Sequence, residues 1–515
     1  MAALTRPSQL PPVPLAELAA LLGAWVAPES GPVDVSGVTL RSSDVLPGDL
    51  FAALPGANTH GIRFASAAAA AGAVAILTYP AGAASLALGK GVKGPAVLAV
   101  TDPRAVLGQV SAVVYGDPSH RLSVLGVTGT NGKTTTSYLL EAALGAAGVP
   151  AGLIGTIESR MQTPDGLVAV PAQRTTPEAP DLQATLASMA ENGVRSVAME
   201  VSSHALALDR VAGTGFEVAG FTNFSQDHLD FHGDLDAYFS AKALLFDGRA
   251  AHEVVMVDDE WGRRLVGPHT VTVSTTGQSN ATWRSSEISA HDGRTSFLAH
   301  GPERSLPVSL DLPGDFNVAN ALLALAMLDC AGVDLEQAVQ GLGAARVPGR
   351  MEVVAAGQPF TAVVDYAHTP AAVATVLAAL RPQTQRNLIL VLGCGGDRDT
   401  GKRALMGEVA ARGCDLLILT DDNPRSENPD AIRAAMREGV RRLDPSERGA
   451  VLELGGRAQA IEAAVGRAGP GDTVVIAGKG HEQGQEIDGL ITPFDDRQVL
   501  ASVLAGHGWI GGQER

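Results

Sequence analysis

The chain has 515 residues, of which 45% are hydrophobic and 18% charged, and its formal net charge is −17 at pH 7. At roughly 100–200 residues per domain, this length predicts about three domains. The hydrophobic content excludes a disordered or fibrous protein. The negative charge excludes a nucleic acid partner bound mainly through its phosphates, since such binding needs clustered Lys and Arg.

The three cysteines, Cys330, Cys394 and Cys414, have neither the number nor the spacing of a disulfide framework or a zinc site, so a reducing compartment is expected. Residues 1–17 contain no apolar core of signal-peptide type, and the longest apolar stretch, 64–77, is interrupted and too short to span a bilayer. We therefore expect a cytoplasmic protein that does not insert into membranes. The sequence does not specify the oligomeric state, for which a monomer is the favoured expectation.

Apolar runs of strand length alternate with helical segments over most of the chain, which is typical of α/β domains with largely parallel sheets. The alanine-rich run at 67–71 is expected to form a helix packed on such a sheet. Turn-rich segments at 116–120 and 347–350 indicate two boundaries. The predicted domains are 1–120, 121–346 and 347–515.

A glycine-rich loop follows the apolar run 123–127 and precedes a helical segment at 137–147. In such a loop the backbone N–H groups surround phosphate oxygens, Lys133 reaches the outer phosphates and Thr134 can hold Mg²⁺. The general P-loop pattern has a glycine where Val127 stands, so it fails at one position. The strand and helix context still favours a nucleotide site over an incidental glycine turn. The predicted contacts are Gly129, Thr130, Asn131, Gly132, Lys133, Thr134 and Thr135.

Three further apolar runs of the middle segment end in polar residues. Glu200 ends one run, Asn223 follows the next and leads to Asp227 and His228, and Asp258 ends the third. The carboxyl ends of parallel strands share one edge of a sheet, where the ligand crevice lies. We therefore expect these loops to converge on the nucleotide, with Glu200 and His228 as suitable Mg²⁺ ligands.

Together these motifs resemble those of the Mur ligase family, which extends the peptide of the bacterial cell-wall precursor. The family's phosphate loop, Thr-Gly-Thr-Asn-Gly-Lys-Thr, occurs unaltered at 128–134, so the missing glycine is a family trait. The resemblance implies that Lys242 is carbamylated and, as an anion, helps Glu200 and His228 to hold a second metal ion. The implied α/β fold has three domains: a central P-loop ATPase-like parallel sheet, a flanking uridine-binding domain and a C-terminal Rossmann-like domain.

Other segments that match the family imply further contacts. In related ligases the segments 314–320, 348–352 and 365–370 contact the nucleotide, which implies Asn317, Arg350, Asp365 and His368 here. Contacts with the nucleotide-sugar precursor are implied for Ser42, Thr175, Thr176, Ser202 and Arg210. Where relatives commonly read Asp-Ser-Arg, this chain reads Arg41-Ser42-Ser43, so only Ser42 carries over from that triplet.

The C-terminal segment contains apolar runs at 388–392, 416–419 and 474–477, each followed by a loop of unusual composition. All three loops should lie at one edge of a sheet. Their glycines permit close approach, two arginines can pair with carboxylates, and Glu482 can hold an ammonium group, as a pocket for an amino acid requires. The residues expected in this pocket are Arg398, Asp422, Asn423, Arg425, Gly478 and Glu482.

The resemblance implies ATP- and Mg²⁺-dependent addition of a third amino acid to UDP-N-acetylmuramoyl-L-alanyl-D-glutamate through an acyl phosphate. The Asp-Asn-Pro-Arg form at 422–425 is the one associated with meso-diaminopimelate, whose distal carboxylate would pair with Arg425. Three alternatives stay open: L-lysine or L-ornithine as the amino acid, a neighbouring or folylpolyglutamate-type ligase, and an ATP-binding protein without catalysis. The presence of all the implied catalytic residues argues against the last; they are Lys133, Glu200, His228 and Lys242. We also expect the C-terminal domain to close over the middle one.

Overall fold

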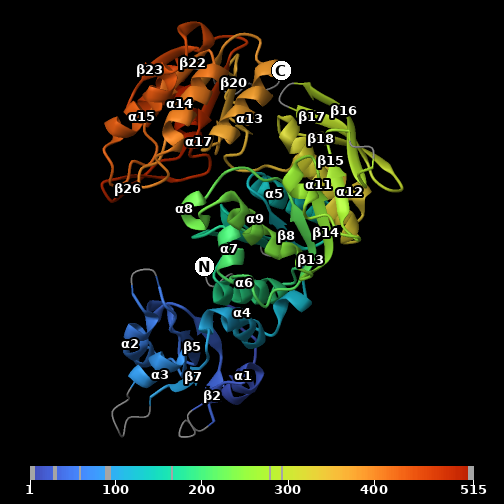
Figure 1. Ribbon diagram of the computed structural model, residues 1–515. Helices are drawn as coiled ribbons and strands as arrows, with labels where there is room; N and C mark the ends of the chain where they lie inside the picture. Colours follow the sequence, from blue (N-terminus) through green and yellow to red (C-terminus); the bar gives the residue numbers. More distant parts are fainter. Residues whose placement is uncertain are drawn as a thin grey trace.

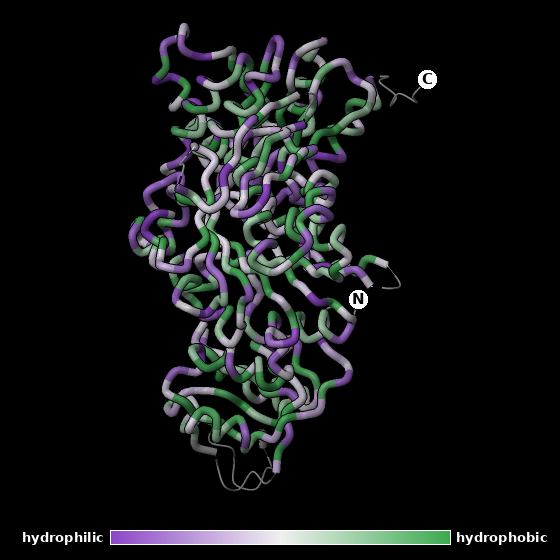
Figure 2. The backbone as a smooth tube through the Cα atoms, turned by 90° about the vertical axis from the view of Figure 1, so that its right-hand side faces the viewer, coloured by the Kyte–Doolittle hydropathy of each residue, from purple (hydrophilic) through white to green (hydrophobic). Residues whose placement is uncertain are grey.

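The computed structural model of the chain describes residues 6–26, 32–56, 59–86, 94–163, 166–277, 280–291 and 294–507. These residues form three α/β domains that lie in a row, from the N-terminal domain at the bottom of Figure 1 to the C-terminal domain at the top. Figure 2 shows the same elongated row from the side, with hydrophobic segments running through each domain. No helix within the described ranges is long and apolar enough to cross a membrane.

The N-terminal domain is built on a five-stranded sheet in the order β2-β7-β6-β5-β4, in which only β2 is antiparallel to its neighbour. Its strands are β2 (Trp25–Val26), β4 (Gly37–Thr39), β5 (Asp49–Ala52), β6 (Ala75–Thr78) and β7 (Ala96–Ala99), and a separate ribbon pairs β1 (Val13–Pro14) with β3 (Asp34–Val35). Its helices are α1 (Leu15–Leu22), α2 (Ala65–Ala70), α3 (Pro80–Ser85) and α4 (Pro103–Val114), with 3₁₀ turns at η3 (Ser42–Asp44), η4 (Gly61–Phe64) and η5 (Pro118–His120). The alanine-rich run forms α2 as predicted, and Ala68 packs against Phe51 and Ile76 of the sheet.

The middle domain contains an eleven-stranded sheet in the order β11-β10-β9-β12-β8-β13-β14-β15-β16-β17-β18. Its strands are β8 (Ser123–Thr128), β9 (Ala151–Ile154), β10 (Glu158–Thr163), β11 (Gly166–Pro171), β12 (Ser196–Glu200), β13 (Phe216–Phe221), β14 (Ala250–Met256), β15 (Val271–Ser274), β16 (Trp283–His291), β17 (Arg294–His300) and β18 (Ser305–Leu310). The strands from β9 to β16 in this order are parallel, as predicted for the centre of the domain. Antiparallel strands, which the sequence analysis did not foresee, extend the sheet on both sides.

Helices of the middle domain cover this sheet. They are α5 (Lys133–Ala146), α6 (Ala179–Glu191), α7 (Ser203–Ala207), α8 (Leu229–His232), α9 (Leu235–Ala243), α10 (Glu260–Arg263), α11 (Asp315–Cys330) and α12 (Leu335–Ala344), with a 3₁₀ turn at η6 (Leu244–Phe246). Helix α11 is apolar on nearly all sides because it is enclosed in the core beside α5. Helix α5 begins at Lys133, four residues earlier than the predicted helical segment, because Gly132 takes a left-handed conformation as its N-cap.

The C-terminal domain has a six-stranded sheet in the order β19-β20-β24-β21-β22-β23, parallel except for β19. Its strands are β19 (Glu352–Val353), β20 (Thr361–Asp365), β21 (Leu388–Leu392), β22 (Leu416–Leu419), β23 (Ala450–Glu453) and β24 (Thr473–Ala477), followed by the hairpin β25 (Gly484–Ile487) and β26 (Leu490–Pro493). Its helices are α13 (Pro370–Leu380), α14 (Lys402–Gly413), α15 (Pro429–Arg441), α16 (Arg457–Val465) and α17 (Asp496–Gly506), with 3₁₀ turns at η7 (Arg381–Gln383) and η8 (Pro445–Glu447). Apolar clusters cover both faces of the sheet, which explains its continuous hydrophobic runs. Since β21, β22 and β24 are parallel neighbours, the three loops that follow them lie at one edge, as predicted.

Candidate nucleotide and amino-acid site

The loop between β8 and α5 forms the centre of the candidate site. Gly129 has a φ of 144° and Gly132 a φ of 88°, both in the region that favours glycine. A Cβ atom on Gly129 would collide with Thr222 Oγ1, and one on Gly132 would collide with Asn320 Oδ1. The two glycines therefore let the loop pass close to its neighbours. The first N–H groups of α5 have no acceptor within the helix, which suits them to an anion.

Two ammonium groups meet at this loop. Lys133 Nζ donates to the carbonyl oxygens of Gly129 and Thr130, both at 2.9 Å, and Lys242 Nζ donates to the same Gly129 carbonyl at 2.7 Å. Lys242 comes from α9, is 1% exposed and lies over the Tyr238 ring. Burial and the nearby Lys133 hold the pKa of Lys242 well below its usual value. A lowered pKa increases the fraction of neutral amine, which is the form that can react with CO₂.

Glu200, at the end of β12, connects the phosphate loop to the loop that follows the neighbouring strand β9. It is 1% exposed and accepts hydrogen bonds from Thr134 Oγ1 at 2.9 Å, Thr156 N at 2.7 Å and Thr156 Oγ1 at 3.0 Å. Hydroxyl and carboxylate oxygens are hard ligands of the kind that Mg²⁺ prefers. Thr156 was not predicted, although it follows β9 as Glu200 ends β12, and a polar residue after a strand was the signal used for the other loops.

A metal ion at this place could not rely on His, Cys, Asp and Glu side chains alone. The described part of the chain contains no group of three or more of these residues that could hold one. The predicted set combines Glu200 and His228 with two other kinds of ligand, the Thr134 hydroxyl and a carbamate on Lys242. The donors therefore fit Mg²⁺ chemically only if oxygen atoms from a carbamate, the nucleotide or water complete the shell.

Asp227 lies at the electrostatic centre of the site, between groups from two domains. Its burial opposes ionisation, but His228 and His368, together with Lys133, lower its pKa overall. His228, whose side chain is 46% exposed, places its Nε2 3.6 Å from Asp227 Oδ2. His228 also has a left-handed φ of 52° at the start of α8. Asp227 lies in a loop that was predicted to face the nucleotide, but no role was predicted for it.

A cavity of about 340 Å³ lies between the middle and C-terminal domains beside the phosphate loop. Predicted nucleotide residues from both domains line it; they are Asn131, Gly132, Thr135, Asn317, Arg350, Asp365 and His368. Arg350 lies over the ring of Tyr366, which the sequence analysis missed, and its Nη2 is 3.4 Å from Thr134 Oγ1. Its buried Nε has no hydrogen-bond partner among the described residues, which leaves one donor for a ligand. Asp365 instead accepts from the backbone N–H groups of Met351 and Ala367 and so fixes the connection between the domains.

Four of the residues predicted to contact the precursor lie together near Glu200. Thr176 Oγ1 donates to the Glu200 carbonyl at 2.9 Å and accepts from Ser202 N at 3.0 Å, while Thr175 Oγ1 lies 3.1 Å from Thr156 Oγ1. The fourth residue, Arg210, pairs with Glu178 at 3.0 Å. The fifth, Ser42, lies in η3 of the N-terminal domain. The adjacent Arg41 reaches across to Gln173 Oε1 at 2.7 Å, so this loop faces the same region.

The loops after β22 and β24 meet around a buried lysine, Lys479. Its ammonium group lies 3.0 Å from both Asn423 Oδ1 and Glu482 Oε2, and 3.9 Å from Asp422 Oδ1. A Cβ atom on Gly478, whose φ is 112°, would lie 2.9 Å from Asp422. Four predicted amino-acid residues are thus brought together, and Lys479, which the sequence analysis did not single out, connects them.

The two predicted arginines are arranged differently. Arg425 has a φ of 54°, donates from Nη1 to the Gly396 carbonyl at 2.6 Å and pairs through its backbone with Glu486 of the β25–β26 hairpin. Arg398 is exposed. A cavity of about 420 Å³ separates this region from the middle domain, and it is lined by Asn423, Glu482 and Glu486 on one side and by Thr156, Ile157 and Glu158 on the other.

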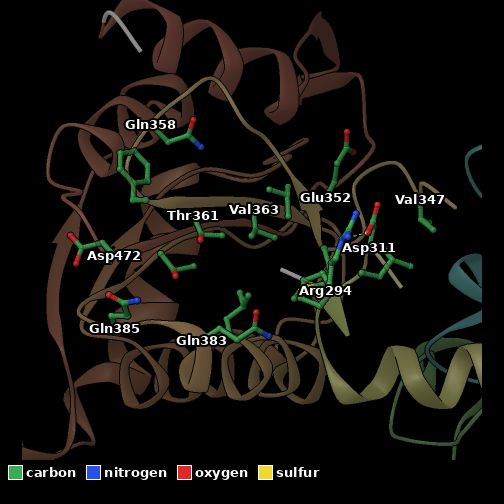
Figure 3. A pocket seen from close by; sticks show the side chains of 18 of the residues that line it. Arg294, Asp311, Val347, Glu352, Gln358, Thr361, Val363, Gln383, Gln385 and Asp472 are labelled. Carbon is green, nitrogen blue, oxygen red and sulfur yellow. Dashed lines mark ion pairs between the residues drawn. The ribbon is translucent and has the colours of Figure 1, made fainter. Parts of the chain in front are cut away.

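A further cavity of about 830 Å³ lies at the opposite edge of the C-terminal sheet (Figure 3). Thr361 and Asp472, near the starts of β20 and β24, line it from the C-terminal domain. On the middle-domain side, Arg294 and Arg346 both pair with Asp311 at 2.7 Å. None of the predicted site residues lines this cavity, which lies beside the connection between the two domains.

Comparisons with known proteins agree over most of the chain. Three family models match it: "Mur ligase family, catalytic domain" at residues 34–125, "Mur ligase middle domain" at 127–328 and "Mur ligase, glutamate ligase domain" at 349–480. The UDP-N-acetylmuramoyl-L-alanyl-D-glutamate–2,6-diaminopimelate ligase of Streptomyces coelicolor is 50% identical over 97% of this chain and 98% of its own length. The protein of that name from Corynebacterium glutamicum is 51% identical over 91% and 92%. A solved structure of a ligase with this name, 33% identical, superposes with a TM-score of 0.64 over 92% of this chain and 96% of its own. The chain therefore belongs to the Mur ligase family.

Proposed function

We propose that this protein adds meso-2,6-diaminopimelate to UDP-N-acetylmuramoyl-L-alanyl-D-glutamate in an ATP-dependent reaction of peptidoglycan precursor synthesis. One observation carries the proposal. Thr134 of the phosphate loop and Thr156, which lines the 420 Å³ cavity beside the amino-acid loops, both donate to the Glu200 carboxylate. Two hydrogen bonds to one carboxylate therefore connect the nucleotide site to the amino-acid cavity. A nucleotide hydrolase would not need a second cavity at this point.

The reaction consists of two displacements. An oxygen of the D-glutamyl carboxylate forms a bond to the γ-phosphorus of ATP while the bond to the bridging oxygen breaks, and ADP leaves. The amine of the third amino acid then attacks the acyl carbon, and phosphate leaves as the amine loses a proton. Acyl phosphates react rapidly with water, so closure of the C-terminal domain over the middle one would protect this intermediate.

Site roles follow from the contacts. The nucleotide phosphates lie on the loop 129–135, with Lys133 neutralising their charge, and Arg350 reaches them from the C-terminal domain. Thr134, Glu200, His228 and a carbamate on Lys242 would hold Mg²⁺, which supplies further charge neutralisation when bound. The depressed pKa of Lys242 supports carbamylation because only the neutral amine reacts with CO₂.

The precursor lies between the N-terminal and middle domains, with its peptide end toward Glu200. Thr176 contacts both the Glu200 carbonyl and Ser202 N, and Arg210 lies 3.4 Å from the Thr176 carbonyl, so we assign contacts with this end to Thr175, Thr176, Ser202 and Arg210. Ser42 contacts the uridine part from the N-terminal domain. We place the domain boundaries near residues 120 and 346 and the protein in the cytoplasm, where nucleotide-activated cell-wall precursors are made.

The amino-acid pocket comprises Asp422, Asn423, Arg425, Gly478 and Glu482, with Arg398 at its exposed rim. Here Arg425 pairs with the distal carboxylate of diaminopimelate, which L-lysine and L-ornithine lack. The test uses purified protein, ATP, Mg²⁺ and the dipeptide precursor, with each of the three amino acids added separately and phosphate release measured. Release with diaminopimelate is expected. Release only with lysine or ornithine would refute the choice of amino acid, and no release with any of them would refute the ligase activity.

A further inference from the structure

The side chain of Lys479 lies beneath the amino-acid cavity without lining it. It is 0% exposed, and its ammonium group donates to Asn423 Oδ1 at 3.0 Å, to Glu482 Oε2 at 3.0 Å and to the Gly484 carbonyl at 2.7 Å. An ammonium group has three N–H donors, so each donor has an acceptor. The three acceptors belong to the loop after β22, the loop after β24 and the start of the β25–β26 hairpin. Lys479 therefore fixes these three segments relative to one another.

The first consequence concerns the amide of Asn423. Its Oδ1 accepts hydrogen bonds from Lys479 and from Glu486 N at 3.1 Å, and its Nδ2 donates to Glu482 Oε2 at 2.7 Å. An Asn side chain can rotate by half a turn and exchange its donor and acceptor ends. Because an ammonium group can only donate, Lys479 permits only the orientation with Oδ1 toward itself. One N–H of Nδ2 is left for the cavity.

The second consequence concerns the carboxylate of Glu482. Its Oε2 accepts from both Lys479 and Asn423, whereas its Oε1 accepts no hydrogen bond from the described residues. Glu482 is 33% exposed and lines the cavity together with Asn423. The cavity therefore presents one amide donor beside one carboxylate acceptor. A carbon that carries both a carboxylate and an ammonium group has the complementary pair.

We propose that Lys479 is a positioning residue that selects a third amino acid with both an ammonium and a carboxylate group at its far end. This inference rests on the proposed function and deepens it. Lysine and ornithine carry only an ammonium group at that end, so they can use Glu482 but leave the Asn423 donor unpaired. Without Lys479 the Asn423 amide keeps only the Glu486 N–H against its Oδ1, so its orientation is held less strongly, and Glu482 is free to move into solvent; the distinction between the substrates therefore weakens.

The test replaces the charge without changing the size of the side chain, in Lys479→Met. The KM for meso-diaminopimelate should rise at least about tenfold, because hydrogen bonds to charged groups are lost or misdirected. The ratio of kcat/KM for diaminopimelate to that for L-lysine should fall by a similar factor, and the KM for ATP should stay within about twofold. Arg412→Met is the matched control, because it removes an exposed cation from the same domain; it should change none of these values.

A thermodynamic mutant cycle separates this role from a merely structural one. If Lys479 acts through Asn423 and Glu482, then Lys479→Met should change the substrate ratio by less than about twofold in the Asn423→Ala/Glu482→Gln background. A full tenfold effect in that background would instead indicate that Lys479 only holds the hairpin through Gly484, and it would overturn the proposal. An unchanged ratio in the single variant would also overturn it.

A folding defect is recognised from ADP affinity, measured by titration calorimetry. If Lys479→Met does not keep the wild-type affinity, Asn423→Asp tests the same arrangement with Lys479 in place. It removes the amide donor, so the preference for diaminopimelate over lysine should fall at least about tenfold, and an unchanged preference would overturn the proposal. Absence of product with the wild-type protein and every amino acid would refute the proposed function itself.

Discussion

The buried ion pair between Arg457 and Asp496 allows a test of how the C-terminal loops are held. Both side chains are 0% exposed, and two parallel hydrogen bonds of 2.7 Å join them. The same guanidinium donates to the carbonyl of Ala477, which ends β24, at 2.9 Å and to that of Asp421, just before the Asp-Asn-Pro-Arg loop, at 3.4 Å. We predict that Asp496→Asn destabilises the C-terminal domain, because it leaves this guanidinium buried without a counter-charge.

The expected magnitude follows from the burial. Breaking a buried pair by removing one partner costs about 3–5 kcal/mol. Asn keeps the size of Asp and one acceptor oxygen, so we expect about 3 kcal/mol, at the lower end of that range. At 1.4 kcal/mol per factor of ten, the open population of the domain should rise about 100-fold. The double variant Arg457→Met/Asp496→Leu buries no charge and should lose much less stability.

Hydrogen exchange followed by mass spectrometry measures this effect domain by domain. Peptides that cover β21 and β24 should exchange faster in Asp496→Asn, while peptides that cover β5 and β6 of the N-terminal domain serve as the internal control. The KM for the amino acid should rise as well, because the Arg457 guanidinium that bonds to the two carbonyls is held less firmly without the Asp496 carboxylate. Equal destabilisation of the single and double variants would refute the reasoning, since it would show that lost contacts matter and the unpaired charge does not.

Three further predictions concern the candidate site. Gly132→Ala should abolish measurable ADP binding in calorimetry, because its Cβ would collide with Asn320. The control is Gly145→Ala in helix α5, where the added Cβ would meet no atom within 4 Å; it should retain binding and stabilise the helix by about 1 kcal/mol. Lys242 should give a carbamate signal in ¹³C NMR with ¹³CO₂ near neutral pH, because its lowered pKa increases the fraction of neutral amine; the signal should weaken as the pH falls and be absent in Lys242→Arg. Arg425→Met should raise the KM for meso-diaminopimelate about 10- to 100-fold and leave that for L-lysine nearly unchanged, and an equal rise for both would contradict the assigned carboxylate contact.

Much of the fold could be predicted because the parallel strands are buried on both faces. Runs such as 388–392 are continuously apolar and end abruptly in polar loops, so both the strands and their common edge were recognisable. The antiparallel strands at the sides of the middle sheet were missed because they lack such continuous apolar runs. Strand β18, for example, alternates exposed and buried residues, a pattern without a continuous apolar run.

The positions of individual residues of the candidate site could be predicted, but most of the contacts between them could not. The loop positions of Glu200 and Glu482 followed from the ends of strands, but their partners did not. Lys479 lies in the same loop as Glu482, and Thr156 follows β9, a strand that was not singled out. Only the packing shows that Lys479 donates to the Glu482 carboxylate and Thr156 to that of Glu200. The burial of Lys242 was likewise not foreseeable from a helical sequence with weak amphipathicity. Tyr238 of the same helix lies beside it, but the Gly129 carbonyl that accepts its hydrogen bond comes from a distant loop and meets it only through tertiary packing.

The position of the 340 Å³ cavity has a consequence for the stability of the whole chain. Its walls belong to two domains with separate cores, so a nucleotide bound there acts as a reversible cross-link between them. At a ligand concentration of 100 times Kd, binding adds about 2.7 kcal/mol to the joined arrangement. That free energy stabilises the contact between the two domains and does not stabilise either core by itself. Saturating nucleotide therefore converts two neighbouring domains into one cooperative unit.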